Sequence, residues 1–180
     1  IIPTLNEEKF IANCLNSFIE ETSLLDQIEI FIIDGGSEDS TLEIAQEFEK
    51  NYKQVRVLEN KRKIQSCAMN LGIKHSNSKY ILRLDAHAEY SGSYIDKSID
   101  EIENAPEDVV NIGGYINTVS LLDTSFSEAI SYALSSKIGV GNSTFRVEVP
   151  TQEVYVDTVP FGCFKRKELI EIGLYDESLQ

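Results

Sequence analysis

The chain has 180 residues, a formal net charge of −14 and an ordinary share of hydrophobic residues, 42%. This length suits one domain, because domains commonly contain about 100–200 residues. The acidity excludes a surface that coats nucleic acid, which requires a basic stripe. It does not exclude an anionic ligand, since a divalent cation among carboxylates can take up phosphate charge.

The three cysteines, Cys14, Cys67 and Cys163, are far apart and form no CxxC pair. This pattern predicts reduced core thiols in a reducing compartment. No stretch approaches the roughly 18 apolar residues that a membrane span requires. We therefore expect a cytoplasmic location, at the inner face of the membrane if further segments of the protein associate with it.

The two ends of the sequence lack the signals that usually open and close a domain. Ile1-Ile2-Pro3 reads as the end of a strand, and Leu179-Gln180 is followed by no terminating residue. We therefore expect residues 1–180 to be a single domain that is truncated at both ends.

The first 112 residues alternate between helical and strand patterns. Asn6, followed by two glutamates, suits the start of the first helix. The predicted elements, in chain order, are a helix to Ile19, a strand 28–33, a helix 42–52, a strand 55–58, a helix 64–71, a strand 80–84, a helix 94–102 and a strand 109–112. This order predicts an α/β fold with a mostly parallel sheet and helices on both faces.

The pattern weakens after residue 113. Apolar residues at helical spacing predict a helix over 126–134. The stretch 135–150 is rich in Gly, Ser, Asn and Thr, and we expect it to form a loop over the site.

Two aspartates follow predicted strands directly: Asp34 and Asp85. Ligands of parallel sheets bind in the crevice beyond the carboxyl ends of the strands. We therefore expect both carboxylates to face one crevice.

The first of these strand ends reads Asp34-Gly35-Gly36-Ser37. A carboxylate here can accept hydrogen bonds from a base or a ribose, and the glycines let a ligand approach the backbone closely. The alternative is a simple strand-to-helix turn in which Ser37 or Asp39 caps the helix. A GxGxxG motif is absent, so dinucleotide binding is not indicated.

The second strand end contains Asp85 and His87, two residues apart. Residues at this spacing in an extended segment project to the same side. A carboxylate oxygen and an imidazole nitrogen can share one divalent ion, and mixed ligation favours Mn²⁺ over Mg²⁺. The alternative is a solvated acidic turn with Asp85 capping the next helix.

Taken together and in order, these motifs resemble the family-two glycosyltransferases. The opening Pro-x-x-Asn-Glu motif is matched by Pro3, Asn6 and Glu7. The family motif Asp-Asp-Gly-Ser-x-Asp-x-Thr is matched by Asp34, Gly36, Ser37, Asp39 and Thr41. The motif Ala-Arg-Asn-x-Gly is matched by Ala68, Asn70 and Gly72. The metal motif Asp-x-Asp appears as Asp85-Ala86-His87. The Asp-Ala-His variant and the Gly139–Asn142 stretch are most similar to bacterial enzymes that extend succinoglycan-type exopolysaccharide.

This resemblance implies a GT-A, Rossmann-like fold. It also implies an inverting glycosyltransferase in polysaccharide synthesis. The sugar donor would be a nucleoside diphosphate sugar, with a UDP-sugar preferred, and the acceptor a saccharide or lipid-linked saccharide. It makes residues 1–112 the donor half and 113–180 an incomplete acceptor half. It implies a divalent metal, with Mn²⁺ preferred, on Asp85 and His87. The donor-binding residues that it implies are Pro3, Thr4, Glu7, Asp34, Gly35, Lys63, Asp85 and Ala86.

The sequence departs from the family pattern in three places. Gly35 replaces the second aspartate and Met69 replaces the arginine of the third helix, which leaves base and sugar preference open. The general base that an inverting transfer requires has no matching residue before Gln180. We therefore expect the base to lie beyond Gln180, and this chain to bind donor and metal but to transfer sugar poorly.

Two other functions stay open at this point. A domain that binds nucleotide sugars, or holds a complex together without turnover, fits the same motifs. A sugar-phosphate nucleotidylyltransferase needs a Gly-rich basic loop after the first strand, where this chain has Thr4-Leu5-Asn6-Glu7.

Overall fold

The computed structural model describes residues 1–120, 122–141, 144–147, 154–156 and 158–178. The chain forms two compact units, the first made of Ile1–Ile112 with Phe161–Gln180 and the second of Gly113–Pro160. The predicted site residues all belong to the first unit. Residues 161–178 pack within that unit, and the division into donor and acceptor halves stays a prediction.

Three parallel strands form one side of the sheet in the first unit. They pair in the order β1 (Ile2–Thr4), β2 (Ile30–Asp34) and β3 (Val55–Glu59). Every residue of β2 is buried, which is the pattern of a strand that is covered on both faces.

A second group of strands pairs in the order β4 (Tyr80–Leu82), β6 (Cys163–Lys165) and β5 (Asn111–Ile112). Strand β6 runs antiparallel to both neighbours. Main-chain bonds join this group to β1, because Ile1 N donates to Leu82 O at 2.8 Å and Leu84 N to Ile1 O at 3.0 Å. The carboxyl ends of β1, β2 and β4 therefore meet at one edge.

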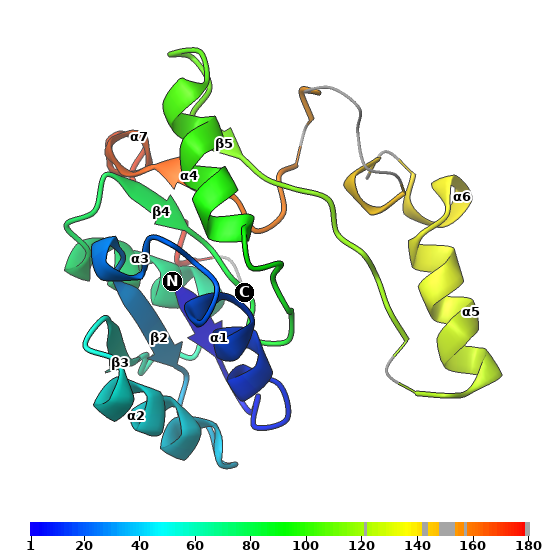
Figure 1. Cartoon of the computed structure of the whole chain (residues 1–180), viewed down its shortest axis with the longest axis horizontal. Coiled ribbons are helices and arrows are strands. Elements are labelled where there is room, and N and C mark those ends of the chain that lie inside the picture. Colours follow the sequence, from blue (N-terminus) through cyan, green and yellow to red (C-terminus); the bar gives the residue numbers. More distant parts are fainter. Residues whose placement is uncertain (121, 142–143, 148–153, 157, 179–180) are drawn as a thin grey trace. The chain divides into compact units, whose positions relative to one another are not determined.

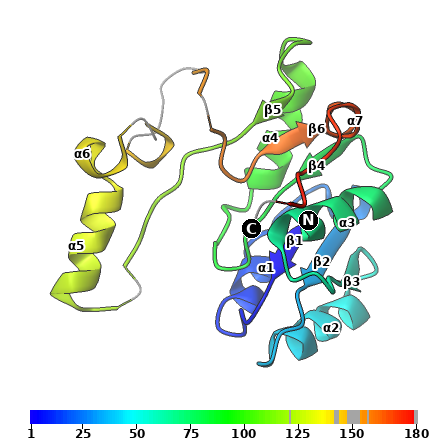
Figure 2. The same cartoon turned by 180° about the vertical axis from the view of Figure 1, so that it is seen from behind.

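Helices cover both faces of this sheet. In Figure 1, α1 (Ile11–Ile19) lies in front of β1, and in Figure 2, seen from behind, α3 (Gln65–His75) lies in front of the strands. The remaining helices of the unit are α2 (Thr41–Asn51), α4 (Tyr94–Asn104), α7 (Arg166–Glu171) and the short 3-10 turn η1 (Leu25–Gln27). The predicted mostly parallel α/β fold is confirmed.

The alternation of side chains along β2 divides the core between the two faces. Ile30 and Ile32 pack in one cluster with residues of α1, α2 and α4. Phe31 and Ile33 point the opposite way and pack with Ala68 of α3. The site edge therefore rests on strands that are held from both sides.

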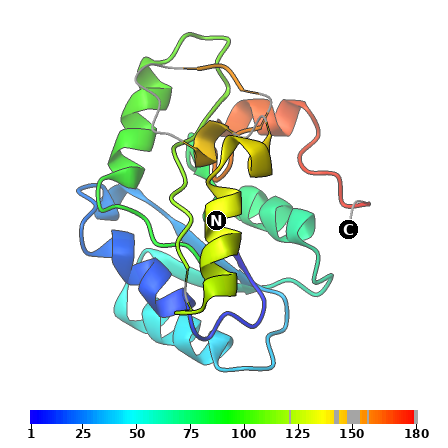
Figure 3. The same ribbon diagram turned by 90° about the vertical axis from the view of Figure 1, so that its right-hand side faces the viewer.

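The second unit is an insertion between two paired strands. It follows β5 and precedes β6, whose pairs Asn111↔Phe164 and Ile112↔Cys163 place the two ends of the insertion side by side. The unit contains α5 (Ser125–Leu134), α6 (Lys137–Val140) and the 3-10 turn η2 (Thr144–Arg146). Figure 3 shows α5, in yellow-green, from the side. No residue of α5 is buried.

Several expected elements differ from the observed ones. The first helix begins at Ile11, because Asn6 adopts a left-handed φ of 57° and its side chain bonds the Asp34 loop instead of the helix. Strand β6 and helix α7 carry no strong sequence period and were not predicted. The stretch 135–150, predicted as a loop, contains α6 and η2, and its residues 142–143 and 148–150 lie outside the described ranges.

None of the helices in the described parts of the chain is both long and apolar enough to cross a bilayer. All three cysteines are buried and free, as predicted.

Candidate functional site

The predicted site residues gather at the edge where β1, β2 and β4 end. Thr4 is paired with Asp34 across β1 and β2, and Gly35 N donates to Thr4 O at 2.8 Å. Asp85 follows Leu84, which is bonded to Ile1 at the start of β1. Asp34 therefore ends β2 and Asp85 follows β4, with β1 between these two strands.

Asp34 organises the loop that follows it. Its side chain is nearly buried, with the residue 3% exposed. One carboxylate oxygen accepts from Gly36 N at 2.8 Å and Ser37 N at 3.0 Å, and the other accepts from Ser37 Oγ at 2.6 Å. Gly36 has a φ of 79°, which glycine adopts at no steric cost. The carboxylate therefore holds the turn with three hydrogen bonds, and about one of its lone-pair sites is unused.

The loop after β1 and the loop after β2 are bonded to each other. Asn6 N donates to Ser37 Oγ at 2.9 Å, and Asn6 Oδ1 accepts from Glu38 N at 2.8 Å. Glu7 N donates to Thr41 Oγ1 at 2.7 Å. Ser37 thus serves the two loops, and it does not cap α2. The two sequence motifs form one structural unit.

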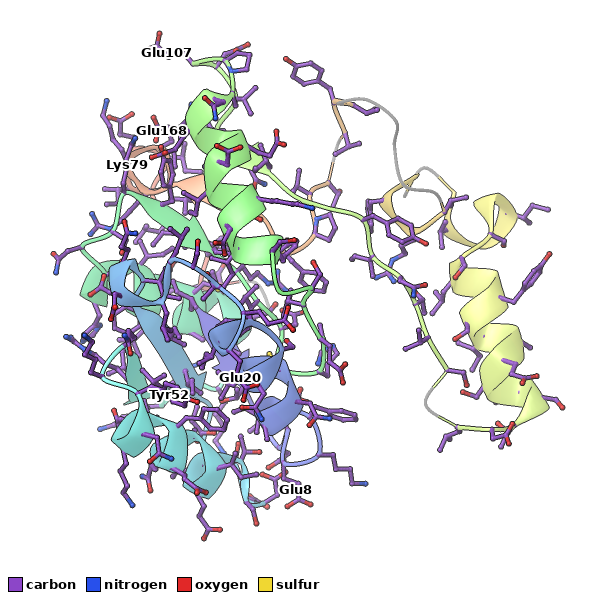
Figure 4. The ribbon with its side chains drawn as sticks, viewed as in Figure 1. Glu8, Glu20, Tyr52, Lys79, Glu107 and Glu168 are labelled. Carbon is purple, nitrogen blue, oxygen red and sulfur yellow. The ribbon has the colours of Figure 1, made fainter. Side chains whose placement is uncertain are left out.

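Glu8 and Asp39 complete this loop pair on its solvent side. Glu8 N donates to Asp39 Oδ2 at 3.1 Å, and Glu8 Oε2 accepts from Ser40 N at 3.1 Å. Figure 4 shows Glu8 at the foot of α1, beside the start of α2. Slight desolvation raises the Asp39 pKa, but hydrogen bonds from Thr41 and Glu8 outweigh it and hold the pKa below its ordinary value.

The Asp85 carboxylate is bound by Arg83, for which the sequence analysis predicted no role. Arg83 Nε and Nη2 donate to Asp85 Oδ1 at 3.2 and 3.1 Å. Both side chains are largely covered. Asp85 caps no helix, because a turn follows it. The spacing of Arg83 and Asp85 could have predicted this contact, because residues two apart in an extended segment point to the same side.

His87 connects this turn to the first loop. Its Nδ1 lies 3.2 Å from Glu7 Oε1, and the imidazole side chain is 59% exposed. The ring therefore has one fixed partner and an open side. All three sequence motifs are joined, by Asn6 to Ser37 and by Glu7 to His87.

The remaining predicted donor residues contribute in different ways. Lys63 reaches the Asp34 loop, because its Cε and Nζ lie 3.4 and 3.5 Å from where a Cβ on Gly36 would stand. Gly35 and Ala86 are buried, so they shape the backbone without exposing a side chain. Pro3 is half-buried inside β1. The Thr4 hydroxyl is buried and has no hydrogen-bond partner among the described residues.

The basic run Lys61-Arg62-Lys63 lies in the turn before α3, which begins at Gln65. Lys63 approaches the Asp34 loop at Gly36. Arg62 Nη1 instead lies 3.4 Å from a carboxylate oxygen of Glu177.

Asn70 was recognised in sequence as part of a motif but received no function. It is buried in α3, where its Oδ1 accepts from Tyr175 N at 2.9 Å and its Nδ2 donates to Tyr175 O and Glu177 Oε1, both at 2.9 Å. This hydrogen bond lowers the pKa of Glu177. Asn70 therefore ties the segment after α7 to the helix that flanks the site.

The arrangement fits a metal only if the ligand supplies most of the coordination. Within the described residues, no group of three or more His, Cys, Asp or Glu side chains is placed to hold an ion. Divalent ions at phosphate-binding sites often take one or two protein ligands and complete their shell with phosphate oxygens and water. Asp85, whose carboxylate also binds Arg83, and the exposed His87 could supply these protein ligands.

Comparison with known proteins decides the family. The profile of glycosyl transferase family 2 matches residues 1–169. The chain belongs to this family. The predicted resemblance is thereby confirmed, on nearly the whole chain and not only on its motifs.

Two curated relatives carry specific names. The chain is 28% identical over 176 residues to the dolichyl N-acetyl-alpha-D-glucosaminyl phosphate 3-beta-D-2,3-diacetamido-2,3-dideoxy-beta-D-glucuronosyltransferase of Methanococcus voltae, covering 95% of this chain and 53% of the relative. It is 31% identical over 148 residues to the succinoglycan biosynthesis protein ExoA of Rhizobium meliloti, covering 81% of this chain and 43% of the relative. The chain thus spans about half the length of these relatives.

Solved structures share the fold. Staphylococcus aureus TarS 1–349 in complex with UDP matches with a TM-score of 0.69 at 15% identity, over 97% of this chain and 48% of that one. The mannosyltransferase PcManGT of Pyrobaculum calidifontis, in complex with GDP-Man and Mn²⁺, matches with a TM-score of 0.68 at 17% identity, over 97% of this chain and 46% of that one. These likenesses confirm the GT-A-like fold.

Proposed function

We propose that the chain is the donor-binding core of an inverting glycosyltransferase that transfers sugar from a nucleoside diphosphate sugar to a saccharide or lipid-linked saccharide in polysaccharide synthesis. The observation that carries the proposal is the joining of three polar loops at the carboxyl edge of the sheet by the Asn6–Ser37 and Glu7–His87 contacts. The family and its named relatives support the reaction class.

In this proposal the nucleoside lies against the Asp34 loop. The Asp34 carboxylate accepts from the base or the ribose, and the unpartnered Thr4 hydroxyl offers a buried hydrogen-bonding group beside it. The base of this nucleoside site is formed by Gly35, Gly36 and the backbone of Pro3 and Ala86. We expect UDP to be preferred, in line with the UDP complex of TarS.

The diphosphate lies toward Asp85, His87 and Lys63 in this proposal. Asp85 and His87 would hold a divalent cation, and their mixed oxygen and nitrogen ligation favours Mn²⁺. When bound, such an ion neutralises the charge of a diphosphate leaving group. Glu7 orients the imidazole of His87, and the ammonium of Lys63 adds positive charge beside the Asp34 loop.

The transfer itself is a single displacement. The oxygen of an acceptor hydroxyl forms a bond to the anomeric carbon while the bond from that carbon to the diphosphate oxygen breaks, and the electron pair leaves with the nucleoside diphosphate. The hydroxyl proton passes to a general base. We place that base beyond Gln180 in the sequence.

We also propose that the reaction takes place in the cytoplasm, at the inner face of the membrane when the acceptor is lipid-linked. The three buried free thiols support a reducing compartment.

Calorimetric titration with UDP, with and without Mn²⁺, tests the donor site, and GDP is the comparison ligand. We expect metal-dependent binding of UDP and a loss of at least about tenfold in its affinity with His87→Ala. The matched control is His75→Ala, which changes the only other histidine, exposed at the end of α3. Absence of binding by any nucleoside diphosphate would contradict the proposal, and equal binding by both variants would remove His87 from the metal site.

A further inference from the structure

Asp85 stands where the sheet stops providing partners for its main chain. Leu84 N still donates to Ile1 O at 3.0 Å. One residue later, Asp85 N donates to the hydroxyl of Tyr90 at 2.7 Å, and the same hydroxyl lies 3.4 Å from Asp85 O, to which it donates. A single side-chain hydroxyl thus satisfies both main-chain groups of Asp85, in the place of a neighbouring strand.

The Tyr90 hydroxyl is itself fixed in position. The residue is 7% exposed, and its own N–H donates to Ser17 Oγ of α1 at 3.0 Å. Its ring contacts three aromatic rings, with centroid distances of 6.3 Å to Phe18, 5.2 Å to Tyr94 and 6.0 Å to Phe161. A ring enclosed in this way cannot turn its hydroxyl toward another partner without losing packing.

Other contacts hold the same turn but do not replace the hydroxyl. Ala88 N donates to Asp85 O at 3.1 Å, and Cys14 Sγ donates to that oxygen at 3.5 Å. Arg83 holds the carboxylate. Each of these reaches the carbonyl or the side chain, whereas Tyr90 is the partner that Asp85 N has in the described structure.

We infer that Tyr90 is a positioning residue for the donor site. Its hydroxyl fixes the main chain at Asp85, and the turn from Asp85 to Ala88 then presents the Asp85 carboxylate and the exposed His87 imidazole in one arrangement. In this inference Tyr90 acts through Asp85 and is not itself a ligand of the donor or the cation. The inference rests on the proposed function, because it concerns the two residues that would hold the diphosphate and its metal.

The Tyr90 hydroxyl matters because its removal leaves the main-chain N–H of Asp85 without a hydrogen-bond acceptor. Asp85 N would have no partner in a covered part of the structure, so the turn would shift toward water to satisfy it. Groups behind a metal ligand commonly change metal affinity by about 10–100-fold when removed, since small displacements of a ligand are enough. The same displacement has a smaller consequence for donor binding without metal, because in the proposed function the nucleoside lies against the Asp34 loop.

The test compares Tyr90→Phe with Tyr94→Phe, in the protein without ligand. Both changes remove one hydroxyl from the same aromatic cluster and keep the ring, but the Tyr94 hydroxyl bonds Phe161 O and not Asp85. Amide hydrogen exchange is measured by NMR at Asp85 and referenced to Ile32 in β2, whose exchange reports global unfolding. We expect Asp85 exchange to accelerate about tenfold or more in Tyr90→Phe and to stay unchanged in Tyr94→Phe. Unchanged exchange in Tyr90→Phe, or equal acceleration in both variants, overturns the inference.

The functional consequence is measured by titration of UDP with and without Mn²⁺. We expect Tyr90→Phe to weaken the metal-dependent binding about tenfold and the metal-free binding by less, with Tyr94→Phe equal to wild type in both. Wild-type affinity in Tyr90→Phe overturns this inference alone. Failure of the wild type to bind any nucleoside diphosphate overturns the proposed function, and this inference with it.

Discussion

Helices α1 and α5, one from each unit, have a similar share of apolar residues but differ in how many of them are buried. In α1, five of nine residues are buried, whereas in α5, which is ten residues long, none is. Both helices were predicted from the same periodicity of apolar side chains. Periodicity therefore predicts that a helix forms, but it does not predict how many of its side chains are buried.

This contrast bears on the candidate site. Its three loops stand on strands that residues of the first unit pack from both faces. Most of a helix's stability in a protein comes from packing and not from propensity. We therefore expect the donor edge to be the more stable region, and the following predictions test that difference.

The largest expected effect comes from Phe31→Ala, set against Phe126→Ala as the same change in the second unit. Phe31 is 2% exposed and Phe126 is 77% exposed. We expect the free energy of unfolding to fall by about 3–5 kcal/mol for Phe31→Ala, which leaves a cavity, and by less than about 0.5 kcal/mol for Phe126→Ala.

Urea denaturation followed by far-UV circular dichroism measures both variants, since the chain has no tryptophan. A loss of several kcal/mol with Phe126→Ala would break the comparison, because it would show that α5 is covered in solution.

An intermediate effect is expected from Asn70→Ala. This change removes three hydrogen bonds to Tyr175 and Glu177 and leaves the N–H of Tyr175 without its acceptor. We expect a loss of about 1–3 kcal/mol in the free energy of unfolding.

The polar control in the second unit is Thr124→Ala, which removes the acceptor for Ser127 N at the start of α5. Unfolding of the first unit, measured in the same way, should change by less than about 0.5 kcal/mol. A larger change would mean that the two units unfold together.

The smallest expected effect is a dependence on pH. The hydrogen bond from Asn70 lowers the pKa of Glu177 below the ordinary value of 4.5. Because the folded state favours the charged carboxylate, Glu177 contributes stability at pH values above 4.5, and this contribution is lost as the pH falls through the lowered folded-state pKa.

Melting temperatures of wild type and Glu177→Gln, measured from pH 7 down to pH 3, test this sign. The wild type should melt higher at neutral pH, and the difference should shrink in acid. The control Glu128→Gln removes the same charge from the second unit. A difference that grows in acid would contradict the assignment of the hydrogen bond.

Sequence patterns predicted the fold of the first unit well, because a buried β-branched run such as Ile30–Ile33 and the periodic helices after it carry their own signal. They failed where the signal is tertiary. The three-residue strand β6 is defined by pairing with β4 and β5. The short helix α7 is defined by packing of Leu169 in a cluster with Ile81 of β4 and Phe164 of β6. Asn6 resembled a helix cap because capping and loop bonding use the same side chain.

The site was predicted in part. The sequence placed Asp34 and Asp85 directly after strands of a parallel sheet, which follows from the order of the elements alone. It could not show that Glu7 contacts His87 across 80 positions, or that Arg83 binds the Asp85 carboxylate. Tyr90 has no motif around it, and only the folded chain brings its hydroxyl to the main chain of Asp85. Which ligands Asp85 and His87 bind stays a prediction.

The pairing of β5 with β6 also bears on how this chain can change. The Ile112↔Cys163 pair holds the two ends of residues 113–160 one strand spacing apart, so the entropy of closing that long loop is offset by the sheet of the first unit. Lengthening such a loop twofold adds only about 0.6 kcal/mol to the closure cost. Insertions, deletions and exchanges in this segment therefore cost little stability, and the segment can diverge while the edge that carries Asp34 and Asp85 keeps its geometry.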